Sequence, residues 1–536
     1  MPQPSNAHVR ISPPRKRLGV RHLQACLMAL VSFVAYALRA NLSVAVVAMV
    51  RTRPRNQTAL AAALLNETSL LNGSVVGLAG EGMGGDVEAD DMMFDWDEKV
   101  RGGLLSAFFW GYMISQVPGG ILSQQLGGSR LLAGALITTS LCTLLLPVCA
   151  LQGGWKAVFA NRVLQGFTQG PVYPSVYTLL GVWVPPHERE IFTTVVLGSQ
   201  LLGPMLASPL CGVIAARWGW PSIFYSFGVL GLATGVLLLS LGADRPSKHS
   251  RISAEELAYI ESCINDGEAP KMQPRTPWLA VISSPCVWVL WLSLSVQAMV
   301  FFTFLTSIPT YLNGVLGFSL EENGLLTSLP YLTGFLSSFF FTWMANWIRD
   351  RKLLSTTNSR KLFNAMANVP ISVCVVATAY VSSKAASVAL ICLSMGFYGP
   401  SFVGVQANYL DLAPLHTGPI YSVGNMMAAV LGVLGPQVVG LIVSDVTDIT
   451  QWRIVFWAQA TVLLTVLMLY TWLGSGKEQP WNHPDYNHKR KRNLNIQEEL
   501  GPVSLQAVPL QGSRTSLSAS PEDKIVANAH IVANKT

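Results

Sequence analysis

Charge is scarce in this sequence, and its scarcity decides the class of the protein. Only 12% of the 536 residues are charged, against about a quarter in an average soluble domain, whereas 51% are hydrophobic. The mean hydropathy is +0.40, and the charges gather in a few loops and tails. These proportions exclude an ordinary soluble domain and predict a protein embedded in a lipid bilayer.

Titratable groups are missing from the interior of the long apolar runs. None of the eight histidines lies inside one, and no Asp or Glu lies deep in one; Asp411, near the end of a run, comes closest. Pumps and transporters build their proton relays from such residues. A proton relay of this kind is therefore not expected in this chain.

Patterns of catalysis are missing as well. The sequence contains no nucleophile–base set, phosphate-binding loop, metal-ligand spacing or nucleic-acid-binding motif. Seven of the eight cysteines fall within apolar runs, so neither a disulfide framework nor a zinc site is expected. We predict that the protein is not an enzyme, holds no cofactor or metal, and binds no nucleic acid.

Continuous apolar sequence is what the chain has in abundance. Each run is close to or above the ~20 residues that a helix needs to cross a bilayer, and none alternates as a strand would. We therefore predict an all-α membrane protein with twelve transmembrane helices. The runs lie near residues 23–50, 102–123, 131–151, 157–183, 191–215, 221–242, 284–312, 324–348, 362–381, 386–410, 418–444 and 453–474.

The positions of Lys and Arg predict the orientation of the chain. Basic clusters lie in both tails, in the stretch 244–276 and in the loop near 349–361. With twelve spans all four clusters lie on one side, which we predict to be cytoplasmic. The net charge of +7 then reflects this bias. The predicted parts are a cytoplasmic tail (1–22), a six-helix half (23–243) with an outer loop (51–99), a cytoplasmic linker (244–283), a second six-helix half (284–475) and a cytoplasmic tail (476–536).

One arginine interrupts the first apolar run. From Leu23 to Val50 the single charge is Arg39, within the string Tyr36-Ala-Leu-Arg39-Ala-Asn41. A guanidinium at bilayer depth costs at least ~2.5–3.5 kcal/mol, so it normally faces a protein interior or a watery cavity. Its planar fork suits a carboxylate or a phosphate, which predicts an anion site. The alternative is an arginine that only binds carbonyl groups between helices.

Several strings together resemble one transporter family. Their order and spacing from residue 23 to about 481 are similar to those of the anion:cation symporter family of major facilitators, which includes sialin, the vesicular glutamate and nucleotide transporters and the type I sodium–phosphate transporters. The strings are Arg39-Ala-Asn41-Leu-Ser43, Gln116-Val-Pro118-Gly119-Gly120, Arg162-Val-Leu-Gln165-Gly166 and Asn408-Tyr-Leu-Asp411.

This resemblance implies a fold and a function. The fold is the major facilitator fold, with two halves of six transmembrane helices and a substrate site between them. The function is secondary active transport of a small organic anion or inorganic phosphate by alternating access. Sodium or the membrane potential is expected to drive it, and the protein is expected to be a monomer. The alternatives are a vesicular nucleotide or amino-acid transporter, and a receptor on the same fold that does not transport.

The resemblance also implies roles for individual residues. Arg39 and Arg162 match the family's anion-site arginines, although Arg162 can equally be a structural or gating cation. Asn41, in the same string as Arg39, is expected to contribute to the substrate site. Asn408 and Asp411 match a signature in span 10 and are expected to have gating or structural roles. Residues expected to line the cavity, or else to pack in the core, are Tyr36, Tyr112 and Phe301.

The sequence departs from the family at positions that carry charge. Gln169 and Gln165 stand where sialin has glutamates, and Tyr177 stands where it has a histidine. Gln297 replaces an arginine of the vesicular glutamate transporters. Gln124 replaces the acid of an inner-gate motif, where it is expected to act through a hydrogen bond. These departures again disfavour proton coupling, and they make Gln169 a candidate gating or structural residue.

Residues 1–22 contain no acidic dileucine string of the kind that sorts sialin. We therefore expect the plasma membrane to be the site of residence rather than a lysosomal or vesicular membrane.

The outer loop makes the topology testable. It contains three sequons, at Asn56, Asn66 and Asn72, so we predict N-glycosylation at one or more of them. A glycosidase should increase the gel mobility of the protein, and replacing all three by Gln should remove this shift. Protease cleavage of the C-terminal tail from outside intact cells would contradict the predicted topology.

Overall fold

A computed structural model describes residues 19–49, 94–96, 98–264, 276–316, 318, 320–381, 383–443 and 448–483, all within one compact unit. The predicted sequons lie outside the described residues. The described part is almost entirely helical, so the prediction of an all-α membrane protein is confirmed, and eight of its helices are long and apolar enough to cross a membrane.

Every predicted apolar run coincides with helix. The N-terminal half contains α1 (Val20–Met49), α4 (Glu98–Leu126), α5 (Gly128–Gln169), α6 (Val172–Trp183), α7 (Arg189–Gly198), α8 (Leu202–Trp218) and α9 (Pro221–Leu241). The C-terminal half contains α12 (Pro285–Gly314), α13 (Leu320–Asp350), α14 (Thr356–Thr378), α15 (Lys384–Gly396), the π-helix η4 (Phe402–Gln406), α16 (Ala407–Leu412), α17 (Thr417–Ile442) and α18 (Ile449–Leu473).

Helix α5 contains one predicted crossing and the first part of the next, which continues through α6. They meet at Gly154, whose backbone has φ 60° and ψ −161° and therefore cannot continue a helix. A positive φ of this kind is readily adopted only by glycine. The turn explains how runs 131–151 and 157–183 form two crossings although only a few residues separate them.

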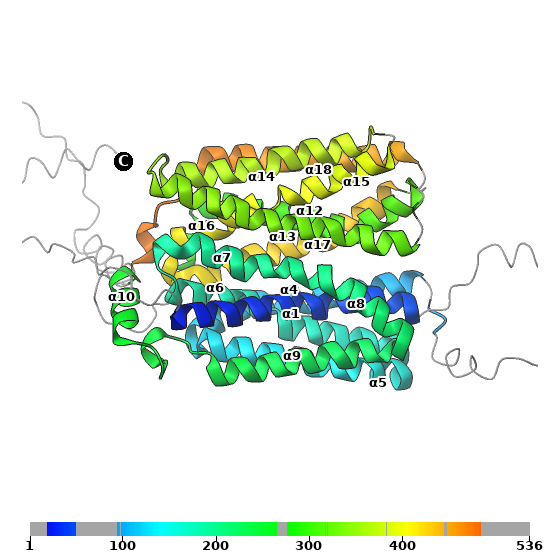
Figure 1. Cartoon of the computed structure of the whole chain (residues 1–536), viewed down its shortest axis with the longest axis horizontal. Helices are drawn as coiled ribbons and strands as arrows, with labels where there is room; N and C mark the ends of the chain where they lie inside the picture. Colours follow the sequence, from blue (N-terminus) through cyan, green and yellow to red (C-terminus); the bar gives the residue numbers. More distant parts are fainter. Residues whose placement is uncertain are drawn as a thin grey trace, which may run out of the picture. The chain divides into compact units, whose positions relative to one another are not determined.

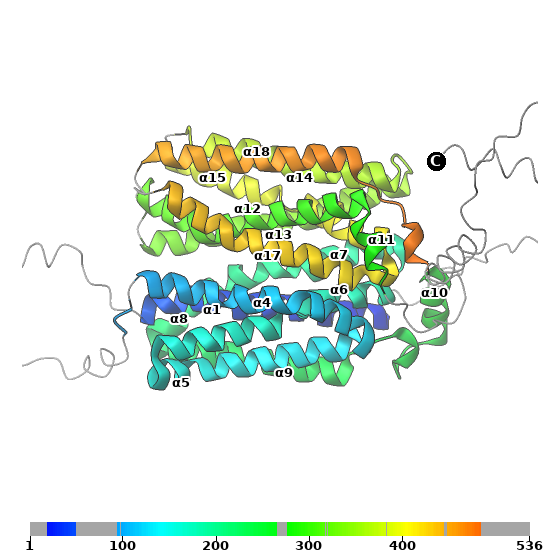
Figure 2. The same cartoon turned by 180° about the vertical axis from the view of Figure 1, so that it is seen from behind.

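The two halves form two adjoining layers. Figures 1 and 2 show α1 and α4–α9 on one side and α12–α18 on the other. The halves meet mainly where α4 packs against α17 and where α7 and α8 pack against α13. The linker helix α10 (Ala254–Ile264) lies at one end of the bundle (Figure 1), which we call the linker end.

The linker helix is tied to the N-terminal half. The Ser253 hydroxyl accepts a hydrogen bond from the Glu256 N–H at 3.2 Å, which is half of the capping box that the spacing of Ser253 and Glu256 in the sequence predicts. The other half of that prediction is wrong, because the Glu256 carboxylate accepts from the backbone N–H groups of Val20 (2.9 Å) and Arg21 (3.1 Å) instead. A carboxylate satisfies free N–H groups at a helix N-terminus, so Glu256 caps α1 rather than its own helix.

The linker also contributes a buried tyrosine. Tyr259 is 2% exposed and contacts the Arg21 guanidinium, with 5.4 Å from Cζ to the ring centroid. Burial raises the pKa of the Tyr259 hydroxyl above its ordinary value, so it stays protonated. Arg21 in turn binds Glu188 and Glu256 at 2.9 and 3.1 Å. This cluster fixes α10 to the start of α1.

Helices α4 and α5 approach until their backbones touch. A Cβ atom added at Gly111 would lie 1.9 Å from the carbonyl oxygen of Val163, and one added at Gly166 would lie 1.8 Å from that of Phe108. Small residues permit this close packing in membrane proteins. It places the aromatic side chains of α4 directly beside the polar residues of α5.

We expect Gly166→Ala to destabilise the protein, because the new methyl group would meet backbone atoms that cannot move aside. Overpacking of this kind typically costs about 1–3 kcal/mol. The measurement is thermal unfolding of purified protein in detergent. Gly134→Ala is the matched control, since it lies on the same helix with no atom within 4 Å of the added Cβ. Equal melting temperatures for the two variants would contradict the packing argument.

Candidate functional site

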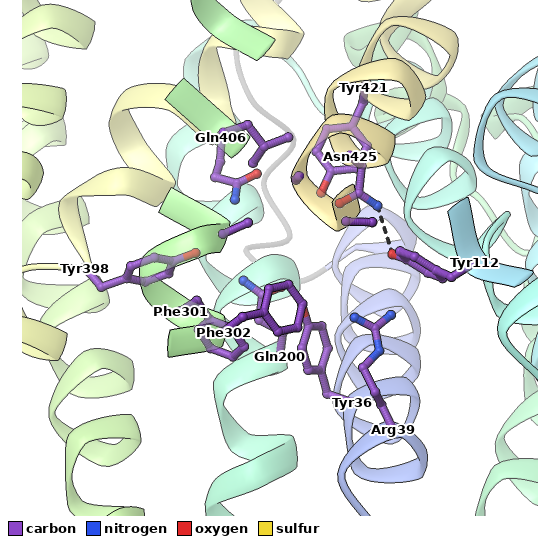
Figure 3. A pocket seen from close by; sticks show the side chains of 14 residues that line it. Tyr36, Arg39, Tyr112, Gln200, Phe301, Phe302, Tyr398, Gln406, Tyr421 and Asn425 are labelled. Carbon is purple, nitrogen blue, oxygen red and sulfur yellow. Dashed lines mark hydrogen bonds between the residues drawn. The ribbon is translucent and has the colours of Figure 1, made fainter. Parts of the chain in front are cut away.

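A cavity lies between the two halves. Its volume is about 30 Å³, which is room for one or two water molecules, so a larger ligand requires the lining side chains to move apart. Arg39 is the single charged residue in its described lining (Figure 3). The lining residues are Tyr36, Arg39, Tyr112, Gln200, Leu294, Ala298, Phe301, Phe302, Tyr398, Gln406, Tyr421, Asn425, Ala428 and Ala429.

The Arg39 guanidinium lies in a box of aromatic rings. Its Cζ atom is 4.7 Å from the ring centroid of Tyr36, 4.8 Å from that of Phe108 and 4.5 Å from that of Tyr112. Within the described residues no carboxylate pairs with it, although only 8% of the residue is exposed. The negative faces of the rings stabilise the cation without neutralising it. A full positive charge therefore remains beside the cavity.

Gln169 holds this guanidinium in place. Its Oε1 atom accepts from Arg39 Nε at 3.3 Å and from Nη2 at 3.1 Å, and its Nε2 donates to the carbonyl oxygen of Ala35 at 2.8 Å. The amide orientation is thus fixed at both ends. The structure places Gln169 against Arg39 within the N-terminal half, so its contacts are those of a positioning residue rather than of a gate.

Arg162 lies outside the cavity. It is 2% exposed, and its Nη1 donates to Gln165 Oε1 at 2.6 Å, while Gln165 Nε2 donates to the Thr143 hydroxyl at 2.8 Å. Its Cζ atom is 5.2 Å from the ring centroid of Phe108, the ring that Arg39 also contacts. In this conformation Arg162 therefore belongs to a buried polar ladder within α5.

Asn41 also lies away from the cavity. It is fully buried, and neither of its side-chain polar atoms has a hydrogen-bond partner among the described residues. The structure thus brings Arg39 together with Tyr36, Tyr112 and Phe301, as the sequence predicts. It does not bring Asn41 to the same space.

Sequence reasoning missed the polar residues that the C-terminal half contributes. The cavity receives amide groups from Gln406 and Asn425, and a third from Gln200 in the 3₁₀ turn η2 (Ser199–Leu201). Asn425 donates to the Tyr112 hydroxyl at 2.8 Å, and the Tyr177 hydroxyl donates to Gln406 Oε1 at 2.5 Å. Both bonds join the halves. Isolated amides in apolar helices were the available signal, but they form no motif.

A second polar cluster joins the halves at the linker end. Asp411 accepts from Arg189 Nη1 at 3.2 Å and from Arg360 Nε at 2.7 Å. Glu190 accepts from Arg360 Nη2 at 3.0 Å and also pairs with Arg349. Arg189 and Glu190 start α7 in the N-terminal half, whereas the other three belong to the C-terminal half. These residues form what we call the gate cluster.

Gln124 makes a separate link between the halves. Its Nε2 donates to the carbonyl oxygen of Leu415 at 2.8 Å, and its Oε1 accepts from the Thr276 hydroxyl at 3.2 Å. Leu415 lies in the 3₁₀ turn η5 (Pro414–His416), between α16 and α17. The contact is of the kind expected for a glutamine at the position of a gate acid. Its role in gating stays a prediction.

Asn408 and Asp411, which share one motif, have different environments. Asn408 Nδ2 donates to the Tyr470 hydroxyl at 2.8 Å and to the carbonyl oxygen of Ser475 at 3.0 Å. It therefore fastens α16 to the segment that follows α18, while Asp411 joins the gate cluster. Sequence analysis assigned Arg349 and Arg360 only to the orientation of the chain and so missed their part in this cluster.

We expect Asp411→Asn to shift the protein towards a state open at the linker end, because Arg189 loses its carboxylate partner and Arg360 retains Glu190 alone of its two carboxylates. Breaking a buried ion pair on one side costs about 3–5 kcal/mol. The apparent KM for uptake from the opposite end should rise at least about tenfold, since fewer molecules present the site there. Arg130→Gln is the control, because Arg130 is exposed and its pair with Asp244 joins α5 to the start of the linker rather than the two halves to each other. An unchanged KM at normal surface expression would contradict the gating role.

Comparison with known proteins identifies the family of this chain. Residues 28–436 match the Major Facilitator Superfamily. The chain is 32% identical to a Drosophila melanogaster protein named "Putative inorganic phosphate cotransporter" over 89% of each chain. It is 30% identical to sialin of Homo sapiens, over 85% of this chain and 90% of sialin. It is 28% identical to vesicular glutamate transporter 3 of Danio rerio, over 91% of this chain and 80% of that protein.

A solved structure shows the same fold. The proton:xylose symporter XylE superimposes with a TM-score of 0.61 at 14% identity, over 85% of this chain and 97% of that one. The relatives are transporters, so the prediction that the chain is not an enzyme is confirmed. With twelve transmembrane helices in two halves, the chain belongs to the Major Facilitator Superfamily and, within it, to the anion:cation symporter family of phosphate cotransporters, vesicular glutamate transporters and sialin.

Proposed function

We propose that this multi-pass transporter carries an organic monoanion with a flat or apolar body, and that Arg39 binds its anionic group. The observation that supports this proposal is a guanidinium without a carboxylate partner among the described residues, at the edge of a cavity otherwise lined by rings and amides. Gln169 occupies Nε and Nη2 of Arg39, which leaves Nη1 for a substrate oxygen.

The rest of the lining favours an apolar substrate body. Six aromatic side chains surround the space and offer ring faces, while three amides offer a few directed hydrogen bonds. Small-molecule sites commonly combine a mainly apolar wall with a small number of polar groups that fix orientation. A single positive charge matches a single negative charge. The six aromatic residues are Tyr36, Tyr112, Phe301, Phe302, Tyr398 and Tyr421.

Inorganic phosphate is the second candidate, because the name of the Drosophila relative points to it. A phosphate dianion would leave one negative charge unmatched by Arg39, so it would require a cotransported cation or a second arginine in the site. The name of the vesicular glutamate transporters keeps a vesicular amino-acid transporter as an alternative. A vesicular nucleotide transporter is the other alternative that the family resemblance implies. Uptake by purified protein in liposomes separates all of these from a receptor that does not transport.

Sodium or the membrane potential would drive the cycle. Within the described residues, the partner of Arg39 is the amide of Gln169, which cannot carry a proton. Cotransport of a monoanion with Na⁺ moves no net charge across the membrane, whereas an anion carried alone responds to the membrane potential, which is worth ~2.3 kcal/mol per 100 mV for each charge moved. We further propose that the linker end is cytoplasmic, that the protein resides in the plasma membrane, and that one chain suffices, because both halves of the cavity come from the same chain.

We expect Arg39→Ala to abolish saturable uptake, because the anion would enter an apolar site without a counter-charge. Arg39→Lys should restore little, since lysine lacks the planar fork that Gln169 grips. The loss should be at least about thirtyfold in Vmax/KM, the range for truncating one partner of a buried charged pair. Liposomes supply the assay, with phosphate, urate, aromatic carboxylates, glutamate, sialate and nucleotides as substrates. Arg217→Ala, at an exposed position, is the control. Near-normal affinity in Arg39→Ala would exclude the proposed site.

We expect Gln169→Glu to make transport depend on pH. At neutral pH the new carboxylate would pair with Arg39 and compete with the anion, so KM should rise. Acidic medium would protonate the glutamate, free the guanidinium and lower KM again. Uptake is measured over a pH series at zero membrane potential, with Gln169→Met as the control that removes the amide without adding a charge. Strict proton-driven uptake by the unmodified protein, insensitive to sodium and voltage, would refute the proposed coupling.

A further inference from the structure

The chain does not leave the bundle at the end of α18. Residues Gly474–His483, which we call the C-terminal strap, fold back across the linker end of the C-terminal half and include the 3₁₀ turn η6 (Pro480–Asn482). Trp481 is 6% exposed and Asn482 is 2% exposed, so the strap is anchored by burial as well as by hydrogen bonds. Nothing in the transport site itself requires this segment.

Hydrogen bonds attach the strap at four points. Gly476 N donates to the Thr357 hydroxyl at 3.0 Å, and Gln479 N donates to the Leu412 carbonyl oxygen at 3.0 Å. Asn482 Oδ1 accepts from the Leu415 N–H at 3.1 Å. The fourth is the bond from Asn408 Nδ2 to the Ser475 carbonyl oxygen at 3.0 Å. A Cβ atom added at Gly476 would lie 3.0 Å from Thr357 Cα, so the strap rests directly on α14.

Each attachment point adjoins a residue that binds the N-terminal half. Thr357 is three residues before Arg360 on α14, which places them on the same face of the helix. Leu412 directly follows Asp411. Arg360 and Asp411 belong to the gate cluster. The strap therefore supports the C-terminal side of the two links at the linker end, which are the gate cluster and the Gln124–Leu415 bond.

Leu415 connects the strap directly to the N-terminal half. Its N–H is bound by Asn482 of the strap, and its carbonyl oxygen accepts from Gln124 of the N-terminal half at 2.8 Å. Asn482 Nδ2 donates to Glu478 Oε1 at 2.6 Å, which turns Oδ1 towards Leu415. A three-residue 3₁₀ turn has few bonds of its own to fix its orientation. Asn482 therefore holds one side of the turn that presents the Leu415 carbonyl to Gln124.

We propose that the C-terminal strap is a component of the gate, and that Asn482 is a positioning residue that holds Leu415 for Gln124 in the state closed at the linker end. The strap contacts only the C-terminal half through these bonds and would move with it when the halves separate. Loosening it weakens the closed state without touching the substrate. Such a change redistributes the protein between two states, and the apparent affinity at each end follows the population of the competent state.

The alternative is that the strap only completes the fold of the C-terminal half. In that case strap variants would lower thermal stability and yield but leave the balance between the two open states unchanged. Access to the cavity from each end, rather than total activity, distinguishes the two.

The experiment compares three variants in the full-length protein. Asn482→Ala removes the acceptor for Leu415. Asn482→Asp combined with Glu478→Gln keeps an acceptor at the Oδ1 position and avoids two neighbouring acids. Lys477→Ala is the control, because that side chain is exposed and belongs to the same strap. Each is combined with Ala298→Cys, which places a reporter thiol in the cavity lining.

The first readout is the rate at which a membrane-impermeant maleimide, applied at the linker end, modifies this thiol. The second is the KM for uptake from the opposite end, measured without the reporter substitution. Asn482→Ala should raise both by about three- to tenfold, the range for one hydrogen bond. The double variant and Lys477→Ala should stay near the parent values. Unchanged rates and KM in Asn482→Ala, with or without a lower melting temperature, would overturn the proposal, and so would an equal rise in Lys477→Ala.

Discussion

The cavity between the halves depends on the one charge in its described lining, the guanidinium of Arg39. Within the described residues Arg39 has no acid beside it, and its stabilisation comes from three ring faces and one amide. Both kinds of partner orient the guanidinium, and neither cancels its charge. A glutamate at position 169 would neutralise the site from within. With glutamine there, the missing negative charge has to come from the ligand.

Charge is handled in the opposite way at the linker end. There the arginines of both halves meet two carboxylates, Glu190 and Asp411, and the pairs cross between the halves. Buried ion pairs contribute little net stability but are costly to break on one side. They therefore suit a contact that has to form completely or separate completely, as alternating access demands. Under the proposed function, the unpaired cation of the cavity attracts an anion, and the paired ions of the gate cluster hold the linker end closed.

The sequence predicts the membrane crossings, their division into two halves and the polar environment of Arg39, each for a clear physical reason. Continuous apolar runs have one stable solution in a bilayer, and an isolated arginine within them needs a polar environment. The amides of Gln406 and Asn425 were not predictable, because their meaning depends on which helix faces the cavity, and periodicity does not show this in helices that are apolar all round. Glu256 misled for a related reason: a local capping motif competed with a nearby free helix end, and tertiary contact won.

Arg162 and Arg360 also show what the sequence alone does not predict, namely the role of each arginine. In sequence, Arg162 resembles an anion-site residue and Arg360 resembles a loop charge that orients the chain. In the structure, Arg162 is bonded to Gln165 of its own helix, and Arg360 spans Glu190, Asp411 and the Val403 carbonyl oxygen. The depth of an arginine in the membrane does not decide its role. The residue that it binds does, whether an amide as for Arg162 or carboxylates as for Arg360. Only the folding together of distant segments decides which arginine finds an acid.

The two sites together suggest why loading and gating are coupled. Under the proposed function the empty cavity carries one positive charge, and a bound monoanion makes it neutral. Enclosing a neutral complex between apolar helices costs less than enclosing a lone charge. Substrate binding would then favour closure of the halves around the cavity, where Tyr112 and Asn425 already join them. The ion pairs of the gate cluster and the Gln124–Leu415 bond would determine which end reopens, so that the anion supplies the driving force for occlusion and the linker end supplies its direction.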